Sequence, residues 1–214
     1  MTEEEKLLAG KIFCPYDPEL VAIKRIAHNA CTEFNRTFED ETEKRNGILK
    51  KLLKSVGVGC YFQGPIYFNY GSHTSIGDNF FGNYNIMISD DAYVSIGHEV
   101  MFGPNVTLAT PLHPMIAGER RSINVNGKIF QPCYAKPITI GDDVWLSAGV
   151  TVCGGVTIGH GSVIGANSVV TRDIPENVFA AGNPCRVIRP IDESDSIINR
   201  LELWESDDQV KRNS

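Results

Sequence analysis

A histidine between two prolines is the residue of this sequence best suited to chemistry. His113 stands in the stretch Thr110-Pro111-Leu112-His113-Pro114, or TPLHP. A reaction in which a hydroxyl attacks as the nucleophile needs a base that takes the hydroxyl proton, because an alcohol is a weak nucleophile at neutral pH. Histidine commonly fills this role, and the flanking prolines restrict its backbone. The alternative is a turn histidine that makes one local hydrogen bond, and the five residues alone leave both open.

The other histidines and the cysteines do not indicate a metal centre. No three histidines share the spacing of a zinc site. His73, beside the stretch NYGS, is a candidate to line a cleft, whereas His28, His98 and His160 are expected on the surface. The six cysteines are scattered without a CxxC pair, which is typical of reduced thiols in a cytoplasmic protein. Cys153 is expected to be a small packed residue.

Composition excludes several classes of function. The formal net charge of -6 argues against a general nucleic-acid binder, which would need a basic surface. No apolar run is long enough to span a membrane. The acidic start MTEEEKLLAG is not a signal peptide. We therefore expect a cytoplasmic protein that is neither a general nucleic-acid binder nor a membrane protein.

A six-residue repeat must build the scaffold that positions His113. Residues 140–175 divide into IGDDVW, LSAGVT, VCGGVT, IGHGSV, IGANSV and VTRDIP. Each block begins with an aliphatic residue: Ile140, Leu146, Val152, Ile158, Ile164 and Val170. A period of six fits neither an α-helix nor a long strand but is a β-helix signature. Each buried aliphatic side chain contributes about 1.5–3 kcal/mol, so the coils are stable only as a stack.

The repeat also runs earlier and then stops at TPLHP. Ile76, Gly82 and Ile88 are spaced by six, as are Ile96, Phe102 and Leu108 after a slip of two residues. The rhythm lapses over residues 111–137. A long loop without regular structure inside a compact domain is usually functional.

The chain therefore divides into three parts. Residues 1–57 are predicted to be helical, with a capping box at Thr2 and Glu5, an N-cap at Asp17, and a third helix in ETEKRNGILKKLLKSVG. Residues 58–190 form the β-helix with its excursion loop, and the helical segment can cover the exposed strand edges at one end. Residues 191–214 are a polar tail with a short helix expected around Leu201–Trp204.

Four stretches together resemble a known family. These are AGKIFCPYDPEL, IYFNYGSHTSIGDNFFGNYNIMISDDAYVSIG, FGPNVTLATPLHP and VTRDIPENVFAAGNPCRVIR. Over about residues 3–190 the chain resembles the maltose and galactoside O-acetyltransferases of the left-handed parallel β-helix superfamily. The left hand comes from the resemblance alone, since the general rule for parallel crossovers favours the right hand. The resemblance implies acetyl-CoA as donor, a sugar hydroxyl as acceptor, His113 as general base, no required metal, and a homotrimer with active sites between subunits.

The resemblance also implies which residues grip the acceptor. Asn83 and Asp91 match family positions that contact sugar hydroxyls. Asn69 stands where the galactoside enzyme has serine and Phe81 where it has tyrosine, so the identity of the sugar stays open. Asp17 lies near an acceptor-contacting position, and its role as N-cap explains it equally well. An asparagine that tolerates a left-handed turn is the alternative for Asn83.

On the donor side, small residues keep the outer wall of the coils low: Ser147, Ala148, Gly165 and Ala166. By resemblance, the backbone amides of Ala148 and Ala166 face the thioester and the pantetheine arm. The Ala148 amide is the candidate oxyanion donor, a contribution of about 3–4 kcal/mol. Trp145 either flanks the pantetheine or packs.

Family positions near the nucleotide end of the cofactor are matched by Thr171, Arg172, Arg186 and Arg189. The fork of an arginine suits phosphate, although each arginine is also explained as a solvated surface residue.

Two rival functions remain. One is an acetyltransferase for another acceptor, such as an antibiotic, serine or an amino sugar. The helical segment of residues 1–57 argues against it, because by resemblance that segment is typical of the sugar-acetylating branch. The other is a trimeric β-helix scaffold without activity. The joint presence of His113, Asn83 and Asp91 argues against that second reading.

Overall fold

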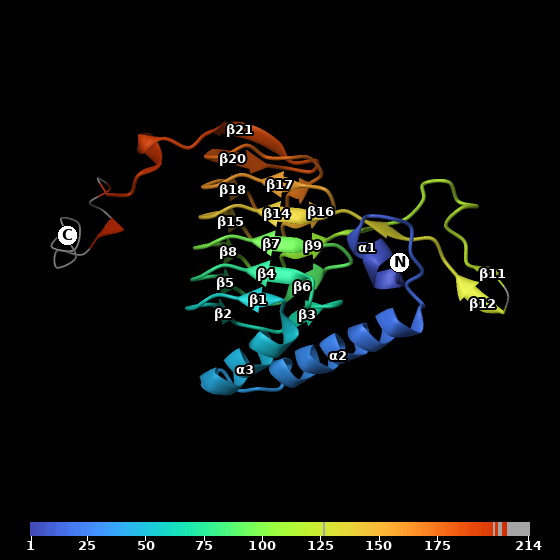
Figure 1. Cartoon of the computed structure of the whole chain (residues 1–214). Helices are drawn as coiled ribbons and strands as arrows, with labels where there is room; N and C mark the ends of the chain where they lie inside the picture. The colour runs from blue at the N-terminus through green and yellow to red at the C-terminus, as the bar shows by residue number, and fades with distance from the viewer. Residues whose placement is uncertain (126, 199, 201–202, 205–214) are drawn as a thin grey trace.

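Short parallel strands stacked around one apolar core form the centre of the molecule (Figure 1). The computed structural model describes residues 1–125, 127–198, 200 and 203–204. Sheet 1 contains β1 (Ser55–Val56), β4 (Thr74–Ile76), β7 (Val94–Ile96), β14 (Ile138–Ile140) and β17 (Thr157–Ile158). Sheet 2 contains β2 (Tyr61–Phe62), β5 (Phe81–Gly82), β8 (Met101–Phe102), β15 (Trp145–Leu146), β18 (Val163–Ile164), β20 (Val178–Ala181) and β21 (Arg186–Pro190). Sheet 3 contains β3 (Ile66–Phe68), β6 (Ile86–Ser89), β9 (Thr107–Ala109), β16 (Thr151–Cys153) and β19 (Val169–Val170).

Each coil takes one strand from each sheet in turn, which confirms the predicted parallel β-helix. The residues that begin the six-residue blocks lie in register on neighbouring coils, as Ile76, Ile96, Ile140 and Ile158 do in sheet 1. All four are buried. The six-residue period therefore sends one side chain inward from each strand of a coil, usually an aliphatic one and in β2 and β8 a phenylalanine.

Two corners of this prism matter below. The turns that lead from sheet 2 to sheet 3 stack as the 2/3 corner, and those from sheet 3 to sheet 1 stack as the 3/1 corner. Several turns hold asparagine with positive φ, including Asn85 and Asn105, whose side chains hydrogen-bond at 2.8 Å. Asparagine tolerates this conformation better than most side chains, so it recurs where the coil turns.

Three helices precede the coils: α1 (Glu3–Leu8), α2 (Pro18–Asn35) and α3 (Thr42–Leu52). Helices α2 and α3 lie beneath the first coil (Figure 1), and their buried side chains join the core of the solenoid. The predicted third helix extends too far. The backbone is extended at Leu53, and Ser55 and Val56 pair with β4, because a parallel partner is available there.

The excursion loop also differs from the prediction, because it contains two antiparallel pairs. Strand β10 (Pro111–Leu112) pairs with β13 (Tyr134–Ala135) at its base, and β11 (Ile123–Val125) pairs with β12 (Lys128–Phe130) in the projecting arm. Phe13 and Cys133 exchange backbone hydrogen bonds of 2.9 and 3.2 Å. The arm is thereby anchored to the N-terminal segment.

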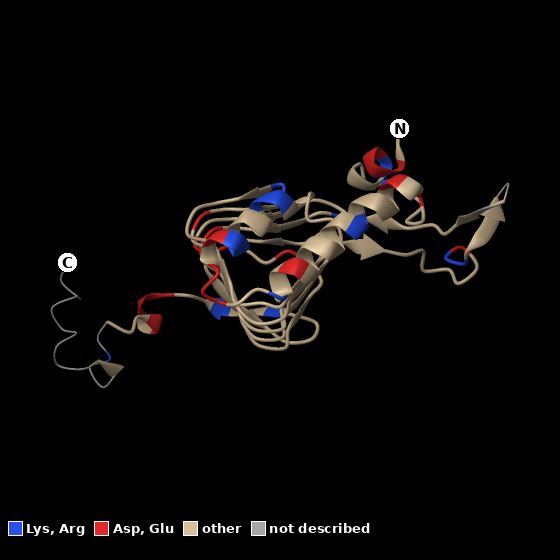
Figure 2. Cartoon of the chain, turned by 90° about the horizontal axis from the view of Figure 1, so that it is seen from below, with Lys and Arg blue, Asp and Glu red and all other residues tan. Residues whose placement is uncertain are grey.

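Seen along the coils, the N-terminal segment and the arm leave the prism on one side and the C-terminal segment on the other (Figure 2). Strand β21 turns back antiparallel on β20, and a short 3₁₀ helix, η1 (Glu193–Asp195), follows. Residues 201, 202 and 205–214 of the predicted tail lie outside the described residues, so its expected helix is not tested. In the described part of the chain, no helix is long and apolar enough to cross a membrane.

Candidate functional site

The 3/1 corner brings Asn69, Asp91 and the loop of His113 onto successive coils. Asn69 follows β3, Asp91 follows β6, and the chain reaches His113 after β9 and β10. Because β3, β6 and β9 are neighbours in sheet 3, their ends stack. Asn69 Nδ2 donates to Asp91 Oδ2 at 2.8 Å. Three of the predicted residues are therefore collected by the topology of one sheet.

Asp91 is a buried carboxyl at this corner. Only 4 % of the surface of Asp91 is exposed to solvent. Burial raises the pKa of Asp91, while the hydrogen bond from Asn69 and the charge of Lys24 oppose that rise. Lys24 Nζ also donates to the carbonyl of Pro15 at 3.2 Å. The N-terminal segment thus contributes a positive charge to the surroundings of Asp91.

His113 is exposed and makes a single polar contact among the described residues. Its Nδ1 lies 3.4 Å from the carbonyl oxygen of Pro132. A carbonyl only accepts, so a neutral ring in this position carries its proton on Nδ1 and keeps the lone pair on Nε2. That tautomer suits a base.

Asp17 lies beside the projecting arm. It accepts from Glu19 N at 3.0 Å, as an N-cap does. It also lines an open cavity of about 720 Å³ with Tyr16, Ile129 and Phe130. The N-cap role is therefore present, and the cavity leaves the acceptor role open.

The 2/3 corner holds Asn83, Ala148 and Ala166, which follow β5, β15 and β18. Asn83 Oδ1 accepts from Tyr84 N at 2.7 Å, so the asparagine also stabilises its turn. Sheet 3 separates this corner from Asp91 and His113. A single chain therefore does not bring Asn83 together with the other acceptor residues.

The amides of Ala148 and Ala166 are available to a ligand. Among the described residues, neither backbone N–H has an acceptor, whereas the carbonyl of Ala148 accepts from Asn167 N at 2.8 Å. Trp145 is 44 % exposed on the outer face of sheet 2. It stands in register with Met101 and Val163, so it is not a core residue.

The four residues predicted to lie near the nucleotide end of the cofactor are found at two places in the fold. Arg186 and Arg189 are on β21, and Arg189 binds Asp195 through two hydrogen bonds of 2.6 and 2.5 Å. This pairing lowers the pKa of Asp195 to about 2. Thr171 and Arg172 are exposed at the 3/1 corner, so sheet 3 also separates them from Ala148 and Ala166.

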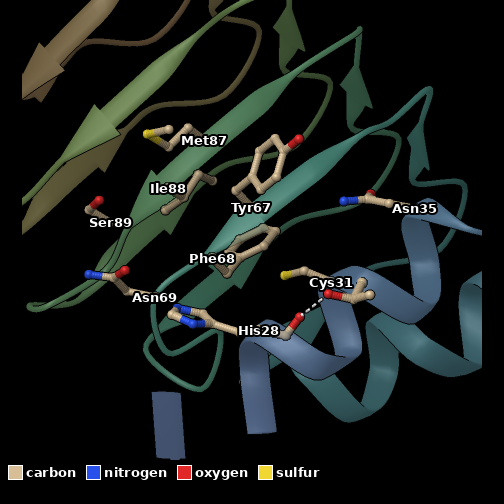
Figure 3. Close-up of a pocket in the computed structure, with 10 residues that line it drawn as sticks. His28, Cys31, Asn35, Tyr67, Phe68, Asn69, Met87, Ile88 and Ser89 are labelled. Atoms are coloured by element: carbon tan, nitrogen blue, oxygen red, sulfur yellow. Dashed lines mark hydrogen bonds between the residues drawn. The ribbon is translucent and has the colours of Figure 1, made fainter. Parts of the chain in front are cut away.

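Sequence reasoning missed a groove of about 270 Å³ between α2 and sheet 3 (Figure 3). His28 is exposed, as expected, and lines this groove together with Tyr67, Asn69 and Met87. The outward positions of β3 and β6 carry Tyr67 and Met87, each 45 % exposed. The sequence signal that could have predicted this groove is the presence of large apolar residues at the outward-facing positions of β3 and β6.

His73, which the sequence left as a candidate to line a cleft, is instead buried. The residue is 2 % exposed and binds Asp90 and Glu4 behind Asp91. Among the described residues, no three histidine, cysteine or acidic side chains are grouped so as to hold a metal ion.

Comparison with known proteins places these features in context. The family described as "Maltose acetyltransferase hexapeptide capping motif" matches residues 6–57, and "Bacterial transferase hexapeptide (six repeats)" matches residues 137–172. Galactoside O-acetyltransferase of Escherichia coli (strain K12) is 43% identical over 195 residues, which cover 91% of this chain and 92% of the relative.

Solved structures agree over the same length. A maltose O-acetyltransferase from Clostridium difficile 630 superposes with a TM-score of 0.84 at 44% identity, covering 90% of this chain and 99% of that one. A galactoside acetyltransferase in complex with coenzyme A gives 0.83 at 43% identity, covering 91% and 94%. The chain belongs to the maltose and galactoside O-acetyltransferase family of hexapeptide-repeat acyltransferases.

Proposed function

We propose that this protein transfers the acetyl group of acetyl-CoA to a hydroxyl of a sugar. The observation that carries the proposal is the corner where Asn69, Asp91 and His113 follow three adjacent strands of sheet 3. A carboxylate and an amide bind hydroxyl groups, and a histidine with an accessible Nε2 takes a proton from one of them. The coenzyme A complex of a relative 43% identical supports the donor.

The reaction is a direct transfer. His113 Nε2 accepts the proton of the sugar hydroxyl as its oxygen attacks the thioester carbonyl. The tetrahedral oxyanion receives the N–H of Ala148, a contribution of about 3–4 kcal/mol. Collapse forms the ester and expels the thiolate of CoA, which takes the proton back from His113.

The active form is a homotrimer with sites between copies. Asn83 and the Ala148 amide lie at the 2/3 corner, across sheet 3 from His113 and Asp91. A threefold arrangement with sheet 3 toward the axis makes the 3/1 corner of each copy meet the 2/3 corner of the next. Every site then receives both sets of residues.

The same arrangement supports a donor site along sheet 2. An apolar row runs in register along its outer face through Met101, Trp145, Val163 and Phe179, and it suits the pantetheine arm. Arg186 and Arg189 stand at the end of this row. Thr171 and Arg172 come from the 3/1 corner of the adjacent copy, which brings a further cation toward the phosphates.

Thiol release from acetyl-CoA tests the proposal with glucose, maltose, a thiogalactoside, serine and chloramphenicol as acceptors. We expect sugar-dependent release that falls by roughly 100-fold or more in His113→Ala. His160→Ala is the matched control, because His160 is exposed at a coil turn and paired only with Asp143 at 3.5 Å among the described residues.

The preferred sugar identifies the acceptor class. A folded protein that binds CoA without acceptor-dependent release contradicts the proposed reaction. Equal rates for His113→Ala and wild type contradict the role of His113 alone.

A further inference from the structure

A buried polar cluster lies directly behind Asp91. Asp90 is fully buried, and its carboxylate accepts from Tyr70 N at 2.8 Å and from Thr74 Oγ1 at 2.9 Å. His73 Nδ1 lies 2.8 Å from the backbone oxygen of Asp90, and its Nε2 lies 3.2 Å from Glu4 Oε1 in α1. The ring stacks on Tyr70 with centroids 4.7 Å apart. His73 therefore joins the turn that carries Asp91 to the N-terminal helix.

Both ring nitrogens of His73 face atoms that only accept hydrogen bonds. One partner is a peptide carbonyl and the other is a carboxylate. A neutral imidazole offers one N–H, so it satisfies one of these partners and sets its lone pair against the other. Only the imidazolium donates to both. The geometry therefore indicates a buried cation in this cluster.

The charges around the ring come from every element packed against it. Glu4 reaches it from α1, and Asp90 and Asp91 lie on the turn between β6 and β7. Lys24 of α2 lies over the Tyr70 ring at 5.6 Å, and Lys54 lies over the Tyr93 ring, whose edge faces His73. Three carboxyl groups thus lie near the ring of His73. The two lysines contact the tyrosine rings beside it and not the imidazole itself.

The cluster fixes the backbone on both sides of Asp91. His73 holds the carbonyl of the peptide that joins Asp90 to Asp91. Thr110 Oγ1 accepts from Ala92 N at 2.9 Å and donates to Ser89 O at 2.8 Å. Thr110 is also the first residue of TPLHP. The backbone position of Asp91, and with it the orientation of its side chain, is therefore fixed by His73 on one side and by Thr110 at the start of the His113 loop on the other.

We propose that His73, as an imidazolium held between Asp90 and Glu4, is a positioning residue that sets Asp91 for the acceptor and couples helix α1 to acceptor binding. The inference rests on the proposed acetyl transfer. It does not involve the donor, whose proposed site runs along the outer face of sheet 2. Removal of either ring bond loosens the turn that carries Asp91, so acceptor binding weakens while donor binding does not change.

Steady-state kinetics of three variants test this role. His73→Phe fills the space without donors, His73→Asn offers one side-chain N–H donor to the carbonyl of Asp90, and Glu4→Gln removes only the charge of the partner. We expect His73→Phe to raise the acceptor KM by about tenfold or more and leave the acetyl-CoA KM within about twofold. Glu4→Gln and His73→Asn give smaller, similar increases in the acceptor KM.

The control is His98→Asn, since His98 is exposed at the turn that leads from β7 of sheet 1 to β8 of sheet 2, and it pairs with Asp78. Equal changes in both KM values, or wild-type behaviour of Glu4→Gln and His73→Asn, overturn the inference. These two mild variants keep the test valid even where His73→Phe does not fold.

Ring-nitrogen NMR of ¹⁵N-histidine-labelled protein, assigned by the loss of one spin system in His73→Asn, gives a readout independent of activity. We expect both nitrogens of His73 to carry protons at neutral pH. A neutral, single-tautomer ring overturns the inference. A wild-type protein without sugar-dependent thiol release instead contradicts the proposed function, so the two failures are distinguishable.

Discussion

Asp91 shows what a single residue gains and loses by burial at the 3/1 corner. Its Oδ2 accepts a hydrogen bond from Asn69, and burial raises its pKa. An aspartate with a raised pKa holds its proton more tightly in the folded chain than in the unfolded chain. Its contribution to stability is therefore favourable at low pH and is lost as pH rises through the interval between the two values.

A pH prediction follows for Asp91. Because the ionised carboxylate is the stronger acceptor for sugar hydroxyls, kcat/KM for the acceptor falls as pH is lowered through a value above that of an ordinary aspartate. Asp91→Asn removes the contribution of Asp91 to this acid limb and raises the acceptor KM by about tenfold. Urea unfolding at neutral pH checks that the variant is no less stable. An unchanged acid limb in Asp91→Asn contradicts the assignment.

The pair of Arg189 and Asp195 gives a second prediction at the residue scale. Both terminal nitrogens of Arg189, which we propose to bind the phosphates of the cofactor, donate to the carboxylate of Asp195. Asp195→Asn frees the guanidinium, so the acetyl-CoA KM falls, by less than about fivefold because the pair is exposed. Glu193→Gln is the control on the same 3₁₀ helix. A rise of the acetyl-CoA KM in Asp195→Asn instead indicates that the ion pair shapes the site.

At the scale of elements, a buried arginine ties α3 to the first coil. Arg45 is 7 % exposed, donates to the carbonyls of Phe62 and Gln63 and to Thr37 Oγ1, and lies 4.3 Å from the centroid of the Phe34 ring. The guanidinium thus satisfies carbonyls where the coil begins, which no apolar side chain does.

We therefore expect Arg45→Met to lower the free energy of unfolding by about 2–4 kcal/mol, since it leaves buried carbonyls without donors. Arg45→Lys keeps the charge but loses the planar guanidinium with its several donors. We therefore expect its free energy of unfolding to lie between those of the wild type and Arg45→Met. Chemical denaturation measures both. Arg36→Met, an exposed arginine at the end of α2, is the control, and equal effects at the two positions contradict the role of Arg45.

The elements also show which features are readable from sequence. Each coil repeats a local rule, one aliphatic residue inward every six, so the β-helix could be predicted. The end of the third helix could not, because Val56 joins a strand by pairing with Ile76, twenty residues later. His73 and Arg45 have ordinary polar types, and only partners distant in sequence, such as Glu4 and Phe62, explain their burial.

At the scale of the whole molecule, the proposed site between the copies of a trimer predicts complementation. His113→Ala damages the 3/1 corner of a copy, and Asn83→Ala damages the 2/3 corner. In trimers assembled from equal amounts of both variants, half of the copies keep His113 and half of their neighbours keep Asn83. About a quarter of the sites are then intact.

Thiol release from the coexpressed variants, compared with each variant alone, measures this recovery. Light scattering establishes the number of copies in the assembly. Activity of the mixture no higher than the mean of the two variants contradicts a site between copies.

The two ends of the solenoid determine how large the particle becomes. A coil of backbone is a template for another coil, so an uncapped stack polymerises into a filament. Here α2 and α3 cover the first coil, β21 turns back antiparallel on β20, and Val169 at the last strand of sheet 3 is bonded to Gly182 and Cys185. These caps give a repetitive sequence a finite length, and they leave side-by-side contact between prisms as the route open to the proposed trimer.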